Sequence, residues 1–239
     1  SVIISSRGTI SPPSINFLAD FETGDLSQVD VFINMPPPQG DGVVEIATAP
    51  NPVHAGIYSC CCHGTGQGGW KVRIHHDMGW SVGDEMGPRR GSVQAWFYIK
   101  ELGGYYVQLI DLIVHTPEPD WDYIWLGVFG IRQDTDMVYL RRQVPYEFEV
   151  QAHYDVQSLV GSWHLIRMDF VIGDGDGELH AFIDGEEVIG MTELYNSAMA
   201  DGRVVGGLDR AIVGITVQTT SAGYTELYVD DFIIIGYNL

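Results

Sequence analysis

The chain has 239 residues, and its 32 Asp and Glu against 12 Lys and Arg give a net charge of −20. Such an acidic chain repels the phosphates of nucleic acids and of anionic membranes, so we exclude DNA and RNA as partners. No apolar run is long enough to span a bilayer, so no membrane insertion is expected, and a chain of this size can form one large β domain without disulfides.

Residues 1–14 form a polar segment with one apolar patch, closed by Pro12 and Pro13. Because proline fixes an extended backbone and cannot donate to a sheet, we expect an extended N-terminal arm outside the domain. Such an arm can add a strand to a neighbouring copy, which would give a homo-oligomer or polymer. The start at Ser1 without Met fits a processed, secreted chain at the cell surface or outside the cell, and also a recombinant start.

The two ends of the domain share a pattern of short apolar runs that carry carboxylates. In residues 17–21 the odd positions are apolar, which predicts a strand with one buried face, and Gly24 marks a turn after it. The closing run 227–232 has the same character. If these strands pair, their carboxylates repel unless a hard cation lies among them, although such residues also occur as turn formers and solvated strand residues. We predict a Ca²⁺ site with the ligands Asp20, Glu22, Asp25, Asp230 and Asp231.

The middle of the chain predicts strands separated by turns. Residues 92–100 are the clearest case, with one apolar face (Val93, Ala95, Phe97, Ile99) and one amphipathic face (Gln94, Trp96, Tyr98, Lys100). Further strands are expected over 43–47, from 55 onward, and over 105–114, 123–132, 137–142, 146–153, 165–172, 178–183, 188–189, 211–218 and 226–235. Only 192–200 indicates a short helical turn. These elements predict an all-β sandwich in a single domain over 15–239.

Three consecutive cysteines, Cys60, Cys61 and Cys62, do not have the spacing of a zinc site. Neighbouring strand residues point to opposite faces, so we expect small buried strand residues. The alternative is a disulfide, either vicinal or between chains.

Several pieces of the chain, in order, resemble the concanavalin A-like jelly-roll superfamily, which includes laminin-G-like domains, carbohydrate-binding modules and several polysaccharide lyases. The pieces are Asp20 to Ser27, Ser92 to Ile99, Gly161 to His164, Phe182 to Gly185 and Tyr228 to Asp231. The resemblance implies a two-sheet antiparallel β jelly roll, often with Ca²⁺ near the terminal strands and a glycan site on the concave face or edge loops. Fold and function remain separate inferences.

A glycan site needs aromatic faces for the sugar ring and amide or carboxylate groups for its hydroxyls. Two sets of residues offer this mixture: Gln94, Trp96 and Tyr98 on one strand, and Trp121, Asp122 and Tyr123 after the loop 115–120. The alternative for the strand set is packing, because aromatic residues in a sandwich are commonly core residues.

Catalytic residues are not expected. Lyases of the alginate type carry Gln-x-His on a concave strand, whereas here Trp96 stands where the histidine would be, and their later Tyr/Lys/Gly/Tyr strand is absent. Glu118, Asp120 and Asp122 alternate as in glycosidases, but Pro117 and Pro119 place them in a loop. We therefore predict a secreted, non-catalytic glycan-binding domain stabilised by calcium. The alternatives are a self-assembling subunit of a filament, surface layer or virion, and a divergent polysaccharide lyase.

Overall fold

The computed structural model describes residues 14–34, 42–66, 70–78, 87–103, 105–115, 123–219 and 223–237. The expected arm lies outside this part of the chain except for Ser14, so its path and any assembly through it stay predictions. In the described part, every regular element is a strand apart from one 3₁₀ turn, η1 (Val156–Leu159). No helix there is long and apolar enough to cross a membrane.

The strands follow one another closely along the chain. They are β1 (Ser14–Ala19), β2 (Asp30–Asn34), β3 (Gly42–Thr48), β4 (Tyr58–Gly66), β5 (Trp70–Asp77), β6 (Arg90–Glu101), β7 (Tyr106–His115), β8 (Tyr123–Arg132), β9 (Met137–Arg142), β10 (Phe148–His153), β11 (Trp163–Val171), β12 (Asp174–Ile183), β13 (Glu186–Tyr195), β14 (Arg210–Thr219) and β15 (Gly223–Gly236).

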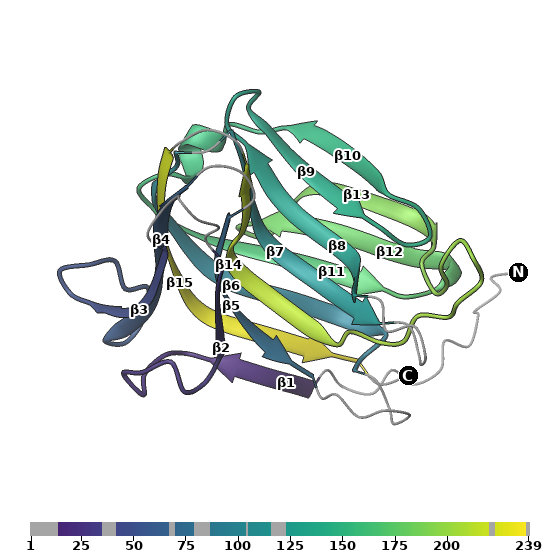
Figure 1. Cartoon of the computed structure of the whole chain (residues 1–239), viewed down its shortest axis with the longest axis horizontal. Coiled ribbons are helices and arrows are strands. Elements are labelled where there is room, and N and C mark those ends of the chain that lie inside the picture. Colours follow the sequence, from purple (N-terminus) through teal and green to yellow (C-terminus); the bar gives the residue numbers. More distant parts are fainter. Residues whose placement is uncertain are drawn as a thin grey trace, which may run out of the picture.

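The strands form two sheets that pack as a sandwich (Figure 1). The eight-stranded sheet has the order β13-β12-β11-β6-β15-β4-β3 with β1 also paired to β15, and the seven-stranded sheet has the order β10-β9-β8-β7-β14-β5-β2. Neighbouring strands are antiparallel throughout the described part. The predicted all-β, two-sheet antiparallel fold is confirmed.

The two ends of the domain meet, as predicted. The purple β1 runs beside the yellow β15 in Figure 1, with Ala19 opposite Phe232. Strand β15 is long enough to take two partners in succession, because its first half pairs with β4 and its second half with β1. Asp20 and Asp231 are therefore brought to the same end of this strand pair.

The core lies between the sheets and follows the alternation seen in the sequence. Val93 and Ala95 of β6 are 0% exposed, and Phe97 and Ile99 are 1% exposed. The intervening side chains of β6 lie on the outer face of the eight-stranded sheet. In β4, Cys60 and Cys62 belong to the core, whereas Cys61 faces outward within a small second cluster. All three cysteines are buried and free, in agreement with the expectation of small buried strand residues.

The structure differs from the sequence prediction in a few elements. Residues 192–200 contain no helical turn, because β13 continues to Tyr195 in antiparallel pairing with β12. The Asn196 side chain then holds the next turn, donating to the Val171 carbonyl and accepting from Gly173 N. Strands β2 and β5 are additional to the predicted strands, and they pair with each other at the edge of the seven-stranded sheet.

Candidate functional site

Polar side chains from five neighbouring strands gather on the outer face of the seven-stranded sheet. On β5, Val72 and Ile74 belong to the core, so Lys71 and Arg73 face outward. The same alternation applies to β7, β8, β9 and β14. We name this group the polar face; it consists of Lys71, Arg73, Tyr106, Gln108, Asp111, Arg132, Tyr139 and Thr216.

A β-bulge in β7 brings Asp111 to the polar face. The register with β8 shifts between Gln108 and Ile110, and both Leu109 and Ile110 point into the core. The additional inward residue reverses the alternation after it, so Gln108 and Asp111 both face outward although they are three positions apart. In a regular strand that spacing would place them on opposite faces, and the sequence carries no sign of the bulge.

Asp111 is the most deeply buried charged group of the polar face, with 0% of its surface exposed. Thr216 Oγ1 donates to its Oδ1 at 2.7 Å, and Arg73 Nη1 lies 3.7 Å from its Oδ2. In the described structure this Oδ2 has no hydrogen-bond partner. Burial raises the pKa of Asp111 to about 6, against the opposing effects of Thr216, Arg73 and Lys71.

Two neighbouring cations accompany this carboxylate. Arg73 also donates from Nη1 to the Thr216 carbonyl at 3.3 Å, and its guanidinium lies 4.8 Å from the centre of the Phe32 ring. Lys71 is two positions away on the same strand face, and burial followed by repulsion from Arg73 lowers its pKa. The crowding of two cations favours an anionic ligand between them.

The other half of the polar face is aromatic. The rings of Tyr106 and Tyr139 stack with centres 5.2 Å apart, and the Arg132 guanidinium lies within 6 Å of both ring centres. Gln108 Nε2 donates to the Tyr106 hydroxyl at 2.7 Å. Tyr139 fits because its partner across the strand pair is Gly130, where a Cβ would lie 2.3 Å from the tyrosine hydroxyl.

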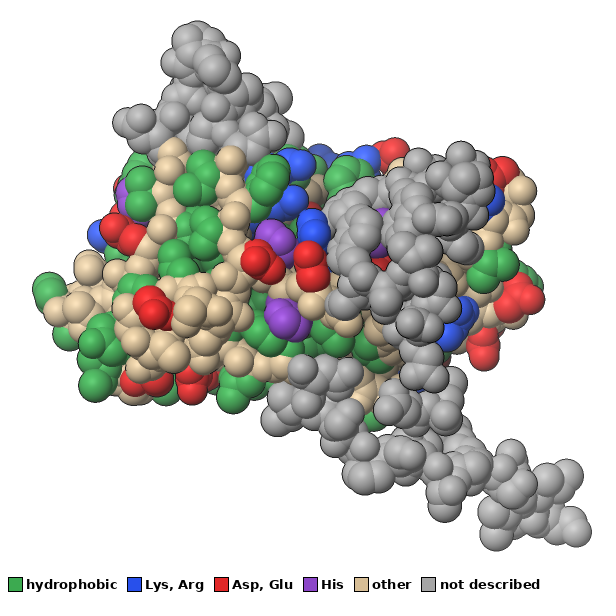
Figure 2. All heavy atoms as spheres, turned by 60° about the horizontal axis from the view of Figure 1, so that its bottom comes forward, with side chains coloured by type: hydrophobic (Ala, Val, Ile, Leu, Met, Phe, Trp, Pro, Cys, Tyr) green, Lys and Arg blue, Asp and Glu red, His purple; other side chains and the backbone are tan. Residues whose placement is uncertain are grey.

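The charge on the polar face runs against that of the whole chain. The polar face holds three cations (Lys71, Arg73, Arg132) and one carboxylate, Asp111. A second carboxylate, Glu149 of the neighbouring β10, accepts from Arg132 at 2.7 Å. In a space-filling view, acidic, basic and histidine side chains lie side by side on one face of the described surface, so the acidic excess is locally interrupted (Figure 2). An acidic chain of net charge −20 thus presents a small region able to receive carboxylates.

The predicted ligand residues of β6 lie on the opposite side of the sandwich. Gln94, Trp96 and Tyr98 face outward from the eight-stranded sheet and are half-buried. The His54 ring stacks on Trp96 with centres 3.9 Å apart, and Trp163 packs against both His54 and Tyr98. One ring face of Trp96 is therefore already covered, which favours the packing alternative. Trp121 and Asp122 lie outside the described residues, and Tyr123 is described only as the first backbone position of β8.

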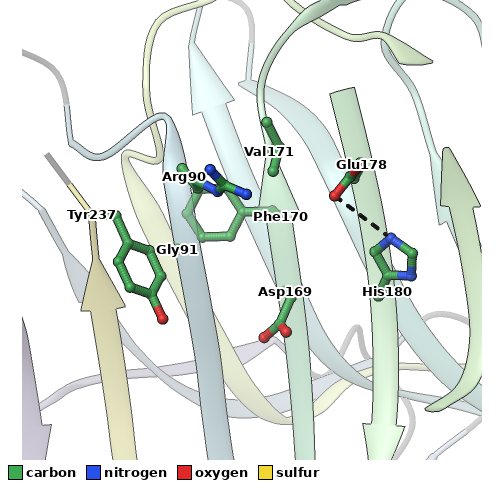
Figure 3. A pocket seen from close by; sticks show the side chains of 8 residues that line it. All are labelled: Arg90, Gly91, Asp169, Phe170, Val171, Glu178, His180 and Tyr237. Carbon is green, nitrogen blue, oxygen red and sulfur yellow. Dashed lines mark ion pairs between the residues drawn. The ribbon is translucent and has the colours of Figure 1, made fainter. Parts of the chain in front are cut away.

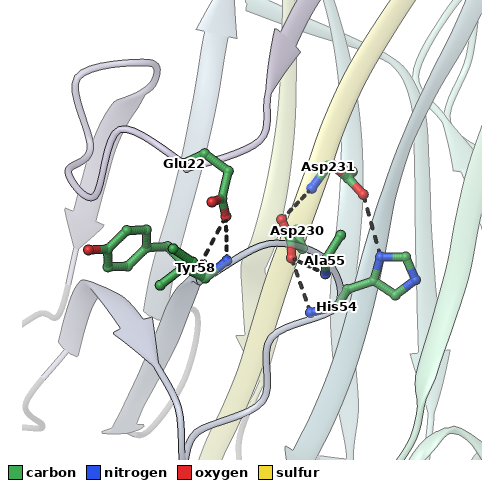
Figure 4. Close-up of polar contacts among 7 residues, drawn as sticks. Glu22, His54, Ala55, Tyr58, Asp230 and Asp231 are labelled. Carbon is green, nitrogen blue, oxygen red and sulfur yellow. Dashed lines mark hydrogen bonds and ion pairs between the residues drawn. The ribbon is translucent and has the colours of Figure 1, made fainter.

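Three of the five predicted calcium ligands, Glu22, Asp230 and Asp231, lie around the loop before β4 (Figure 4). Glu22 Oε1 accepts from the main-chain N–H groups of Ile57 and Tyr58, and a Cβ at Gly56 would lie 2.2 Å from that oxygen. Asp230 Oδ2 accepts from His54 N and Ala55 N on the same loop. Both ends of the domain thus hold one loop through carboxylates, which sequence spacing alone did not indicate.

These five carboxylates do not converge on one point in the described structure. Groups of three metal-binding side chains with mutually close donor atoms occur elsewhere, and none includes Asp20, Glu22, Asp25, Asp230 or Asp231. Asp20 accepts from Glu22 N and the Gln28 side chain, and Asp25 from Ser27. Main-chain and side-chain donors occupy positions that a cation would need, so the residues as placed do not fit a shared Ca²⁺, and calcium stays a prediction.

A pocket of about 300 Å³ opens on the eight-stranded sheet (Figure 3). The side chains of Arg90, Asp169, Glu178 and His180 surround it, and Gly91 contributes to its lining. Burial raises the pKa of Asp169, and Arg167 Nε lies 3.0 Å from its Oδ1. With two carboxylates against one lining guanidinium, this pocket is less suited to an acidic ligand than the polar face.

Neither a protein-family model nor a curated protein matches the sequence. Solved structures match in fold: an endo-β-1,4-glucuronan lyase from the fungus Trichoderma reesei aligns over 93% of this chain and 96% of its own, with a TM-score of 0.64 and 16% identity. A carbohydrate esterase from Shiga toxin-encoding bacteriophage phi24B aligns over 95% and 100%, with a TM-score of 0.56 and 14% identity. An alginate lyase of polysaccharide lyase family 7 aligns over 87% and 84%, with a TM-score of 0.53 and 7% identity. The resemblance to the concanavalin A-like jelly roll is confirmed at the level of the fold.

Proposed function

We propose that the polar face binds an acidic polysaccharide, that is, a glycan containing uronate sugars. The observation that carries this proposal is the group of three cations, Lys71, Arg73 and Arg132, on the outer face of one sheet in a strongly acidic chain. Arginine matches a carboxylate with two parallel hydrogen bonds, and lysine adds a point charge. A neutral glycan would gain nothing from their charge, although Arg73 and Arg132 also pair with Asp111 and Glu149 within the protein.

The aromatic half of the polar face supports a sugar ligand in particular. Tyr139 stacks on Tyr106, but Tyr106 is partly exposed, so the exposed part of its ring can pack against the C–H side of a pyranose while Gln108 orients its hydroxyl. One strand, β14, separates Lys71 and Arg73 on β5 from Tyr106 on β7, so one short stretch of an acidic glycan can contact both the cationic and the aromatic groups.

The structural neighbours are consistent with this ligand class. Solved structures of similar fold include the glucuronan lyase and alginate lyases, some of the latter in complex with product or substrate. The glucuronan lyase aligns over nearly its whole length. Our proposal puts the glycan site on the polar face of the seven-stranded sheet, on the opposite side from the β6 residues that the sequence indicated.

Binding is tested by titrating the protein with glucuronan, alginate and a neutral β-glucan in a calorimeter. We expect binding of the two uronate polymers that weakens with added salt and no binding of the neutral glucan, since charge carries the recognition. Lys71→Gln should weaken binding about tenfold, the equivalent of roughly 1.4 kcal/mol.

Arg167→Gln is the matched control, because Arg167 faces outward from the other sheet. Equal loss of affinity in Lys71→Gln and Arg167→Gln would contradict a site on the polar face. Binding of the neutral glucan with the same affinity as the uronates would contradict acidic recognition altogether.

A second candidate is cleavage of the same polysaccharide by β-elimination, and the position of Tyr106 favours it. Elimination removes the proton on the carbon next to the uronate carboxylate, forms a C=C bond and breaks the bond to the leaving glycosidic oxygen, which takes up a proton. Arg73 and Gln108 are suited to neutralise the carboxylate, and a tyrosine phenol can exchange the proton. This is the lyase alternative, transferred from β6 to the polar face.

An unsaturated uronate product absorbs in the ultraviolet, so incubation with glucuronan or alginate tests the second candidate. We expect Tyr106→Phe to remove product formation while keeping binding within about threefold, a change of roughly 0.7 kcal/mol. Binding without any product in the unaltered protein would leave the glycan-binding proposal and rule out elimination on these polymers.

Calcium at the chain ends is tested by substituting Glu22. Because Glu22 accepts two main-chain N–H groups, Glu22→Ala removes the acceptor and should lower the free energy of unfolding by about 1–3 kcal/mol even with a chelator present. A loss seen only with added calcium would instead support an ion at this position.

An extracellular location and assembly through the arm also remain proposals from the sequence.

A further inference from the structure

We propose that Glu45, Cys61 and His63 bind a transition-metal ion of the Zn²⁺ type on the outer face of the eight-stranded sheet. Cys61 and His63 are two positions apart on β4, so they point to the same side, while Cys60 and Cys62 lie in the core. Glu45 of β3 is directly opposite Cys61. The proposal is independent of the glycan site, which lies on the other sheet.

The spacing of the donor atoms fits one ion. A donor atom of each residue lies within 4.8 Å of the other two, and His63 Nε2 is 3.7 Å from Glu45 Oε1. Zn²⁺ bonds of about 2.0–2.3 Å in tetrahedral geometry require donor atoms roughly 3.3–3.8 Å apart. The Glu45 side chain is 60% exposed and can close the remaining distance by a change of rotamer.

The donor set also identifies the kind of ion. Sulfur, imidazole nitrogen and carboxylate oxygen together are ligands for Zn²⁺ and similar ions, whereas Ca²⁺ and Mg²⁺ take oxygen alone. Three protein ligands leave a fourth position for water or an external ligand.

The surroundings of the site add negative charge, and the Tyr228 hydroxyl forms a hydrogen bond with the Cys61 thiol that a metal ion would replace. Glu226 of β15 is opposite His63, and it accepts from Lys100 at 2.9 Å and from the Tyr224 and Tyr228 hydroxyls. Although burial opposes it, these hydrogen bonds hold the pKa of Glu226 below its usual value, so the group stays charged. Lys100, the nearby cation, is thereby held by Glu226.

A metal ion here must displace a thiol proton. Burial, followed by repulsion from Cys62, Glu226 and Glu45, raises the pKa of Cys61 to about 12, so the thiol is protonated before binding. Formation of the metal–sulfur bond releases that proton to solvent.

We make no such proposal for the other group of three close donors in the described part of the chain, which is Asp30, His75 and Asp77. Arg210 contacts both oxygens of Asp77, one of them at 2.8 Å, so a cation already occupies that carboxylate. His75 therefore provides a matched control.

Titration of the full chain with Co²⁺ tests the site, because a tetrahedral thiolate complex gives visible bands and a sulfur-to-cobalt charge-transfer band. We expect one Co²⁺ per chain, displaced by Zn²⁺, with a dissociation constant that falls about tenfold for each pH unit raised. Cys61→Ser should remove the charge-transfer band, and His63→Ala should weaken binding at least tenfold, while His75→Ala should leave both unchanged.

Glu45→Gln extends the test to an exposed side chain whose substitution leaves the core untouched, and it should weaken binding about tenfold. A charge-transfer band that persists in Cys61→Ser would overturn the proposal. So would Co²⁺ affinity unchanged in Glu45→Gln and His63→Ala, or failure of the unaltered protein to bind Co²⁺ at all.

Discussion

The outer faces of the two sheets differ in what they bury. On the seven-stranded sheet, polar side chains are buried on the outer face, outside the core between the sheets. Asp111 and Thr216 are 0% exposed and Gln108 is 1% exposed. On the eight-stranded sheet, half-buried aromatic rings pack on one another, as His54 does on Trp96. The eight-stranded sheet also buries carboxylates, Asp230 and Glu226, but their oxygens accept hydrogen bonds. Asp111 Oδ2 accepts none in the described structure, and such a buried group costs free energy, so the first face carries a feature that stability alone does not explain.

Aromatic residues on an outer sheet face are therefore weak evidence for a ligand site. Trp96 and Tyr98 meet neighbours from β11 and the loop before β4, and these contacts account for their presence. The polar face has a stacked tyrosine pair and cations beside a carboxylate, one oxygen of which accepts no hydrogen bond in the described structure. Function is better sought where buried polar groups remain incompletely paired.

The largest expected effect on stability comes from removing an arginine, and it should differ between the outer faces of the two sheets. Arg73→Ala removes the cation beside the buried Asp111, and we expect a loss of about 3–5 kcal/mol in the free energy of unfolding. Arg167→Ala, on the other sheet, breaks a partly exposed pair with Asp169 and should cost about 1 kcal/mol or less. Urea unfolding measures both, and equal losses would mean that the two faces do not differ in this respect.

A second test uses the titration of Asp111. Its pKa is raised to about 6 in the folded protein, whereas in the unfolded chain it has its ordinary lower value, so the folded state binds the proton more tightly. Acidification from pH 7 to pH 4 should therefore stabilise the unaltered protein relative to Asp111→Asn by on the order of 2 kcal/mol. The raised pKa of Asp230 is common to both proteins and cancels in the difference. Parallel stability curves across this range would argue against a buried, titrating Asp111.

The smallest expected effect on stability concerns the aromatic rings on the outer face of the eight-stranded sheet. His54→Ala removes the ring stacked on Trp96 and should lower the free energy of unfolding by about 0.5–1.5 kcal/mol. Because this contact is packing, uronate binding should be unchanged. Weaker uronate binding in the variant, measured in the calorimeter, would return the β6 residues to the ligand site.

Local patterns were sufficient for most strands. The alternation in 92–100 predicted both faces of β6, and the apolar ends predicted that β1 pairs with β15. Polar residues also alternate in β5, at Lys71, Arg73, His75 and Asp77, and this pattern could have identified the strand. The same pattern fits a solvated segment when the neighbouring strands are not known. The strand with the clearest pattern, β6, predicted glycan-binding residues, but it belongs to the other sheet.

The sequence by itself determined an all-β sandwich whose end strands meet, because alternation of apolar residues is a local property that each strand carries alone. Only the tertiary structure decided which polar residues share a face. The bulge that turns Asp111 outward, the order that places β14 between β5 and β7, and the pairing that brings Glu45 to Cys61 all depend on contacts between distant segments. No spacing along the chain encodes them, because strand order and register are set by the packing of the whole sandwich.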